Sequence, residues 1–142
     1  MNESGISLLR YPYDDDSWHL QLSGSDAGFG GTQEFYAHPD ELVAFATKLT
    51  EFPRSIRDEA RFERGAPPGR YADYVLLRAY LYDSVGHAAL EFAVHSTVGL
   101  PAGGRAHFHI GCDVAALNRL GEQLHHWIHA TDEPLIWNAR NA

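Results

Sequence analysis

Alternating apolar and polar positions predict three strands in the first quarter of the chain. Residues 5–11 form a short, mainly apolar segment that is interrupted by Pro12. The next segment has an apolar residue at every other position, which is typical of a strand with one buried face. These apolar residues are Trp18, Leu20 and Leu22. A glycine-rich turn at 24–31 and a third strand at 32–37 complete the predicted pattern.

Two other segments repeat apolar residues at intervals of three and four, which predicts amphipathic helices. The first begins at His38 or Pro39 and ends at Pro53, and the second follows Asp113, a favourable N-cap residue. Gly121 inside the second helix costs roughly 1 kcal/mol relative to Ala, unless it allows a close approach to the sheet. The apolar positions are Leu42, Phe45, Ala46, Leu49 and Phe52, and then Val114, Leu117, Leu120, Leu124 and Ile128.

Three further strands are predicted at residues 74–82, 88–95 and 105–111, again from alternation. The segment 54–70 has two interpretations. Arginines at helical spacing favour an extra turn or two of helix, whereas the alternation around Ala60 and Phe62 favours a strand.

This order of elements predicts an α+β fold. We expect a mostly antiparallel sheet of five to six strands with both amphipathic helices packed on one face. Residues 1–130 would form a single domain, because no linker or repeat divides them. Residues 131–142 would be a C-terminal extension whose Leu135, Ile136 and Trp137 are apolar enough to dock on this domain or on a partner.

The net charge of the chain indicates which classes of binding partner are favoured. The 142-residue chain has 11 Lys and Arg against 19 Asp and Glu, for a net charge of -8. This sign disfavours nucleic acid and anionic membranes as partners and is compatible with a basic protein. A single cysteine excludes an intrachain disulfide, and neither a signal peptide nor a membrane-spanning apolar run is recognisable. We therefore expect a cytoplasmic protein.

The face of the predicted sheet opposite the helices is rich in histidine. His107 and His109 lie on one side of a strand, and His95 and Glu91 lie on the neighbouring strand. Imidazole and carboxylate ligands in this arrangement are suited to Zn or Fe. The competing interpretation is a solvated polar face, which antiparallel sheets ordinarily present.

Other chemical motifs are weaker. Cys112 precedes a helix N-terminus, where a thiolate is stabilised, but a lone cysteine at a strand end is more often a small buried hydrophobic residue. Gly28, Gly30 and Gly31 match no nucleotide-binding fingerprint and are explained by a tight hairpin turn. His125 and His129 lack the glutamate of a metalloprotease helix. We therefore predict no catalytic residue, no cofactor and no enzymatic activity.

The C-terminal half of the chain carries most of the resemblance to a known family. The segment from Gly86-His87-Ala88 through Leu90-Glu91-Phe92, then Phe108 to Asp113 and the helix carrying Leu117 and Leu120, resembles the WapI-type immunity group. Proteins of that group are encoded beside polymorphic or contact-dependent toxins. The resemblance spans residues 17–128, but the 99–104 loop is long and the Trp137 tail has no counterpart. It implies a protein that neutralises a cognate toxin by binding it, without catalysis.

Three hypotheses follow. The first is a protein-binding module, and the second is a small metal- or ligand-binding enzyme that uses the histidine-rich face. The third is a structural domain that dimerises through its open sheet face. The residues predicted to contact a protein partner are Tyr74, Tyr80, Tyr82, Arg78, Asp14, Asp15 and Asp16.

Overall fold

The computed structural model describes residues 4–12, 16–65, 73–96, 103–130 and 133–140. In these ranges the chain forms eight strands and two helices, so the predicted α+β class is confirmed. In chain order the elements are β1 (Gly5–Arg10), β2 (Trp18–Asp26), β3 (Phe29–Ala37), α1 (Pro39–Glu51), β4 (Glu59–Arg64), β5 (Tyr74–Leu81), β6 (His87–Ser96), β7 (Gly104–Asp113), α2 (Val114–Ile128) and β8 (Leu135–Asn138).

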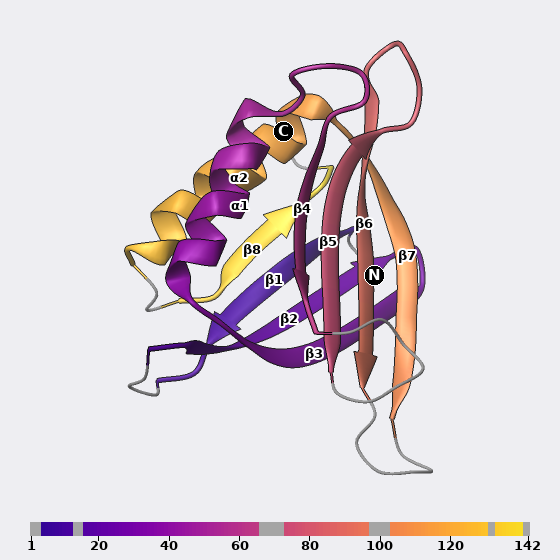
Figure 1. Cartoon of the computed structure of the whole chain (residues 1–142). Helices are drawn as coiled ribbons and strands as arrows, with labels where there is room; N and C mark the ends of the chain where they lie inside the picture. The colour runs from indigo at the N-terminus through magenta and orange to yellow at the C-terminus, as the bar shows by residue number, and fades with distance from the viewer. Residues whose placement is uncertain (1–3, 13–15, 66–72, 97–102, 131–132, 141–142) are drawn as a thin grey trace.

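The strands form two sheets, so the prediction of one sheet of five to six strands is wrong. Each sheet has four strands and is antiparallel, with the orders β3-β2-β1-β8 and β4-β5-β6-β7. Figure 1 shows β1 to β3 running obliquely across β4 to β7, with α1 and α2 side by side next to β8 and β4. Alternation identified the strands, but it carries no information about which strands share a sheet.

The core lies between the two sheets and the helix pair. Leu22 of β2, Phe35 of β3 and Leu77 of β5 contribute to the same buried cluster as Phe45 of α1 and Leu120 of α2. Each sheet therefore has its apolar face covered partly by the other sheet and partly by helices. In the described part of the segment 54–70, the strand interpretation is confirmed for Glu59–Arg64, which form β4 with Ala60 and Phe62 buried in this core. Residues 66–70 lie outside the described ranges.

Two glycines allow the sheets to approach each other closely. Gly24 and Gly31 are paired across β2 and β3. A Cβ on Gly24 would lie 2.5 Å from the ring of Phe92, and one on Gly31 would lie 2.8 Å from the Cβ of Ala106. The turn predicted at 24–31 is present but narrower: β2 continues to Asp26, β3 begins at Phe29, and Gly28 lies in the turn between them with a φ of 97°. Gly24 and Gly31 lie within the strands and serve the contact between the sheets.

Both helices begin as the sequence predicts. His38 is the N-cap of α1, its Nδ1 accepts from the Asp40 N–H, and the Glu41 carboxylate accepts from the His38 N–H. Asp113 caps α2 by accepting from the Ala116 N–H at 2.9 Å. These contacts satisfy N–H groups that a helix start leaves without intrahelical partners. In the described ranges, neither helix combines the length and the apolar character needed to cross a membrane.

Gly121 allows the two helices, rather than a helix and a sheet, to pack closely. A Cβ at this position would lie 2.8 Å from the Ala46 carbonyl oxygen and 2.8 Å from the Leu49 Cβ of α1. Asn118, one turn earlier, donates to the Leu49 and Phe52 carbonyls at 2.9 and 2.8 Å. The same face of α2 thus supplies both a close backbone contact and a cap for the end of α1.

The C-terminal segment is part of the sheet rather than a loosely attached extension. Residues 135–138 form β8, which pairs with β1, and Trp137 is 1% exposed. The Trp137 Nε1 donates to the Ala116 carbonyl at 2.8 Å. Side chains of α2 also donate to the open edge of β8: Arg119 to the Asn138 carbonyl and Gln123 to the Ile136 carbonyl. Covering an edge in this way hides groups that could pair with another chain.

Replacing Gly24 by Ala tests the contact between the sheets. The added methyl group would clash with the buried Phe92 ring, and overpacking of this kind costs about 1–3 kcal/mol. We expect Gly24→Ala to lower the free energy of unfolding by about 2 kcal/mol in urea titrations. Gly111→Ala is the matched control, because a Cβ at this strand glycine meets nothing within 4 Å. Equal effects of the two substitutions would contradict the assignment.

Candidate functional site

The face of the β4–β7 sheet that points away from the core, called here the outer face, carries most of the predicted site residues. Figure 1 shows the helices and the other sheet on the opposite side of these strands. Alternation and register place the following residues on the outer face: Glu59, Arg61 and Glu63 of β4; Tyr74, Leu76, Arg78 and Tyr80 of β5; Ala89, Glu91, Ala93 and His95 of β6; and Arg105, His107 and His109 of β7.

Glu91 is the centre of a hydrogen-bonded network on this face. Its Oε1 accepts from Arg78 Nε at 2.6 Å, and its Oε2 lies 2.7 Å from His107 Nε2. Arg78 also donates to Glu59 at 3.3 Å. Burial of Glu91 opposes ionisation, but the hydrogen bonds from Arg78 and His107 outweigh it and lower the pKa of this carboxyl. The network is therefore charged and internally paired at neutral pH.

A second contact on the outer face joins Tyr80 and His109. The Tyr80 hydroxyl lies 2.8 Å from His109 Nδ1, and Arg78 lies over the Tyr80 ring at 4.2 Å. One potential ligand atom from each of Glu91, His107 and His109 falls within 4.8 Å of the others. The structure therefore brings together three of the four residues that the sequence suggested as metal ligands.

His95, the fourth suggested ligand, lies apart from this cluster. It is on the same face of β6 as Glu91 but four residues further along, a separation of roughly 13 Å at the rise of a strand. Its partners in register are Tyr74 and Arg105. His107 pairs with Ala93, so it is diagonal to both Glu91 and His95 across the β6–β7 ladder. Its Nε2 contacts Glu91.

Tyr74 is part of the outer face but is not available as an exposed anchor for a partner. It is 6% exposed, and its hydroxyl donates to Glu63 at 2.5 Å. Burial, together with the neighbouring Glu63 carboxylate, raises the pKa of Tyr74 to about 12. Its role in this structure is to tie β5 to β4.

Three exposed apolar side chains lie in the segments at one end of the β4–β7 sheet. Because Glu59 pairs with Tyr80, the chain enters β4 and leaves β5 at the same end of the sheet. Ile56, Tyr82 and Val85 lie there, with exposures of 67, 58 and 75%. We call these three residues the turn end. Of these three residues only Tyr82 was predicted from the sequence, since single exposed apolar residues in loops carry no periodic signal.

The turn that carries Tyr82 and Val85 is held by Asp83. Its carboxylate accepts from the backbone N–H groups of Val85 and His87 at 3.0 and 3.1 Å, and it contacts the His87 ring at 2.5 Å. The His87 hydrogen bond lowers the pKa of Asp83. The Tyr82 ring stacks on His87 with centroids 5.9 Å apart. An aspartate that bonds to N–H groups two and four residues later is a turn signal that the sequence contains.

Asp16, the described residue of the acidic run, does not extend this surface. Asp14 and Asp15 lie outside the described residues, and Asp16 precedes β2. The first residue of β2, Trp18, packs edge-on against Trp127 near the end of α2, at 6.2 Å. Figure 1 shows this start of β2 at the lower left and the β5–β6 turn at the upper right. The tyrosines and Asp16 therefore do not form one continuous site.

Cys112 has the properties of a structural cysteine. It is half-buried on β7 next to the core. Burial, reinforced by the neighbouring Asp113 carboxylate, raises the pKa of the Cys112 thiol to about 12. The helix N-terminus that follows does not overcome this desolvation. A thiol of this kind is a poor nucleophile at neutral pH.

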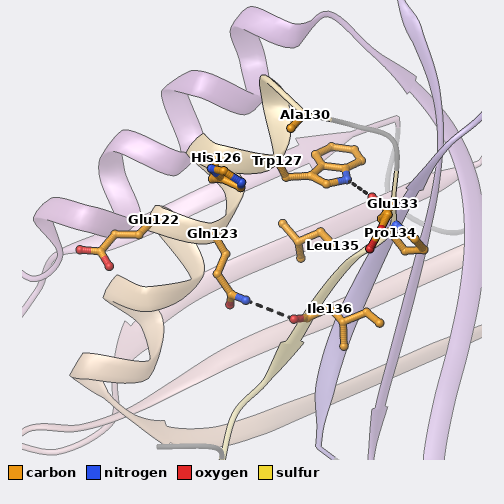
Figure 2. A pocket seen from close by; sticks show the side chains of 9 residues that line it. All are labelled: Glu122, Gln123, His126, Trp127, Ala130, Glu133, Pro134, Leu135 and Ile136. Atoms are coloured by element: carbon orange, nitrogen blue, oxygen red, sulfur yellow. Dashed lines mark hydrogen bonds between the residues drawn. The ribbon is translucent and has the colours of Figure 1, made fainter.

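A groove of about 660 Å³ lies between α2 and β8. Figure 2 shows the residues that line it, and its dashed lines mark the hydrogen bonds from Trp127 to Glu133 and from Gln123 to Ile136. The groove is large enough for a ligand by volume. The residues that line it include Gln123 and Trp127, which also hold the β8 segment against α2. The groove is therefore explained by the packing of β8 on α2.

The raised pKa of Tyr74 predicts a specific loss of stability in alkali. A folded-state pKa of about 12, against roughly 10 in the unfolded chain, gives stability that is complete below pH 10 and is lost as pH rises toward 12. Between pH 9 and 12 the wild type should lose about 2 kcal/mol more unfolding free energy than Tyr74→Phe. Urea titrations at several pH values measure the difference, and equal losses would contradict the prediction.

Alkylation tests the state of Cys112. The chain has one cysteine, so the signal has a single source. At pH 8 we expect native protein to react with iodoacetamide at least about 100-fold more slowly than protein in urea, because the thiolate population is depleted by the raised pKa. Similar rates in the two states, followed by mass spectrometry, would show that Cys112 is reactive after all.

Comparisons with known proteins show little similarity. No family model matches the chain, and no curated protein matches it. Among solved structures, the chain is similar to the plant transcriptional regulator PBF-2, with a TM-score of 0.41 and 12% identity over 94% of this chain and 91% of that one.

Proposed function

We propose that this protein is a non-catalytic protein-binding module, and specifically an immunity protein that neutralises a cognate toxin by binding it. The observation that carries the proposal is the turn end, where Ile56, Tyr82 and Val85 expose apolar surface beside the outer face. Three large exposed apolar side chains at the same end of a sheet are candidates for contact with a partner, and aromatic residues in particular are enriched at protein interfaces.

The β5–β6 turn, which carries two of the three turn-end residues, is held by local contacts that favour tight binding. Asp83 fixes the turn through two backbone N–H groups, and Tyr82 stacks on His87. A side chain already held in place loses little conformational entropy when a partner docks. Tyrosine is also among the residues that most often dominate binding energy at protein interfaces. Tyr82 is therefore the expected anchor.

The polar part of the outer face would contribute specificity more than affinity. Arg78, Glu59 and Glu91 already pair with one another, so this network offers a fixed pattern of charge rather than free charges. Such patterns fix the register of a partner and reject wrong ones. The overall charge of -8 would speed encounter with a basic partner surface over a longer range.

The toxin as partner rests on the resemblance of residues 17–128 to WapI-type immunity proteins. In such a system the partner is the product of a large toxin-like reading frame beside the gene. Stoichiometric binding by a rigid, acidic domain needs no active-site nucleophile, which agrees with the raised pKa of the Cys112 thiol.

Binding to that neighbouring gene product tests the proposal. We expect a one-to-one complex by co-purification and calorimetry, and Tyr82→Ala should weaken it by at least about 10-fold. Ile136→Ala is the matched control, because Ile136 is similarly exposed (67%) but lies on β8 of the other sheet. Absence of a complex at micromolar concentrations, an equal loss with Ile136→Ala, or a stable homodimer that buries Tyr82 would overturn the proposal.

A further inference from the structure

The strongest chemical feature outside the turn end is the cluster of Glu91, His107 and His109. The two histidines are separated by one residue on β7, so both imidazoles lie on the outer face. Glu91 is opposite His109 in the β6–β7 register. Pairing of two strands, rather than a flexible loop, therefore fixes the relative positions of the three side chains.

The distances are close to those of a metal site. Ligand atoms around a zinc ion with bonds of about 2.0–2.2 Å lie roughly 3–3.5 Å apart. His107 Nε2 and Glu91 Oε2 are already 2.7 Å apart. The full set of three lies within 4.8 Å, and the two imidazole rings have centroids 5.4 Å apart. Zinc binding would require the exposed His109 ring to move closer to the other two ligands.

Neighbouring side chains orient two of the three ligands. Arg78 holds Glu91 Oε1 at 2.6 Å, which leaves Oε2 directed toward His107. Tyr80 contacts His109 Nδ1 at 2.8 Å. When that nitrogen carries the proton and donates to Tyr80, Nε2 keeps its lone pair for an ion. Metal-binding histidines usually have such a partner on the second ring nitrogen.

We propose that Glu91, His107 and His109 bind a first-row transition-metal ion, with Zn²⁺ as the preferred occupant and water at the open fourth position. Two imidazoles and one carboxylate are the ligand set of zinc sites that keep an exchangeable water. Nitrogen ligands also favour Zn²⁺ over Mg²⁺ or Ca²⁺. The hydrogen bond between His107 and Glu91 joins two members of the cluster, and strand register together with the Tyr80 contact places His109 beside them. The site does not depend on the proposed partner.

Titration of tag-free protein with ZnCl₂ tests the site. Calorimetry should give one ion per chain, and His107→Ala, His109→Ala and Glu91→Gln should each weaken binding by about 10–100-fold or more. Both histidine side chains are at the surface, so their removal should leave the fold intact, and circular dichroism checks this. Bound Co²⁺ should give the visible absorption of a low-coordinate site, and this should disappear in His107→Ala.

The helix α2 provides the control, because its His125 and His129 are one helical turn apart and could chelate an ion independently. His125→Ala/His129→Ala should leave zinc affinity and the Co²⁺ spectrum unchanged. The proposal is overturned if binding to the wild type is well below one equivalent, or if the α2 variant loses binding while His107→Ala and His109→Ala retain it. Several weak sites of equal affinity would indicate adventitious surface binding and would also overturn it.

Discussion

The close contact between the two sheets at Gly24 and Gly31 is the constraint on which the arrangement of this protein depends. With no Cβ at either position, the Phe92 ring and Ala106 approach the β2–β3 backbone directly. Buried interiors are close-packed, so a single methyl group at this point would have to displace a fully buried ring. Phe92 and Ala106 belong to the apolar side of the β4–β7 sheet, so this contact lies on the side that faces inward.

Once that inner side is fixed, the strand period of two assigns every other residue of β4 to β7 to the outer face. Leu76 and Ala89 lie on this face but are buried beneath longer side chains. The polar residues around them satisfy one another: Arg78 bridges two glutamates, and Tyr74 binds Glu63. Mutual hydrogen bonding gives the outer face a defined chemical pattern. A defined pattern is useful for recognising a protein surface and equally for positioning ligands around an ion.

Edge protection is the second consequence of the packing. The β8 strand would expose a free edge beside β1, but Arg119, Gln123 and Trp127 of α2 donate to its carbonyl oxygens or to the segment that leads into it. The three residues follow one another at intervals of four positions, so they lie along one side of the helix. The helix therefore contributes its apolar face to the core and a donor stripe to the sheet edge.

Local pattern was enough to predict most elements and the identity of many core residues. The first strand, β1, was located as a short apolar segment stopped by Pro12. Alternation located β2 and β5 to β7, and intervals of three and four located α1 and α2, because these periods reflect the geometry of each element alone. The residues of the candidate cluster on β6 and β7 were also found this way, since two adjacent strands joined by one loop commonly pair.

Only the tertiary structure could decide the rest. The division into two sheets, the burial of Tyr74 and the docking of Trp137 depend on contacts between segments far apart in the chain. The roles of Gly24 and Gly31 likewise depend on a distant ring and methyl group, so a local pattern could only suggest a turn. The sequence by itself determined the elements and their polar and apolar faces, because each depends on neighbouring residues. The partner of each face was decided by packing, because it depends on the whole chain.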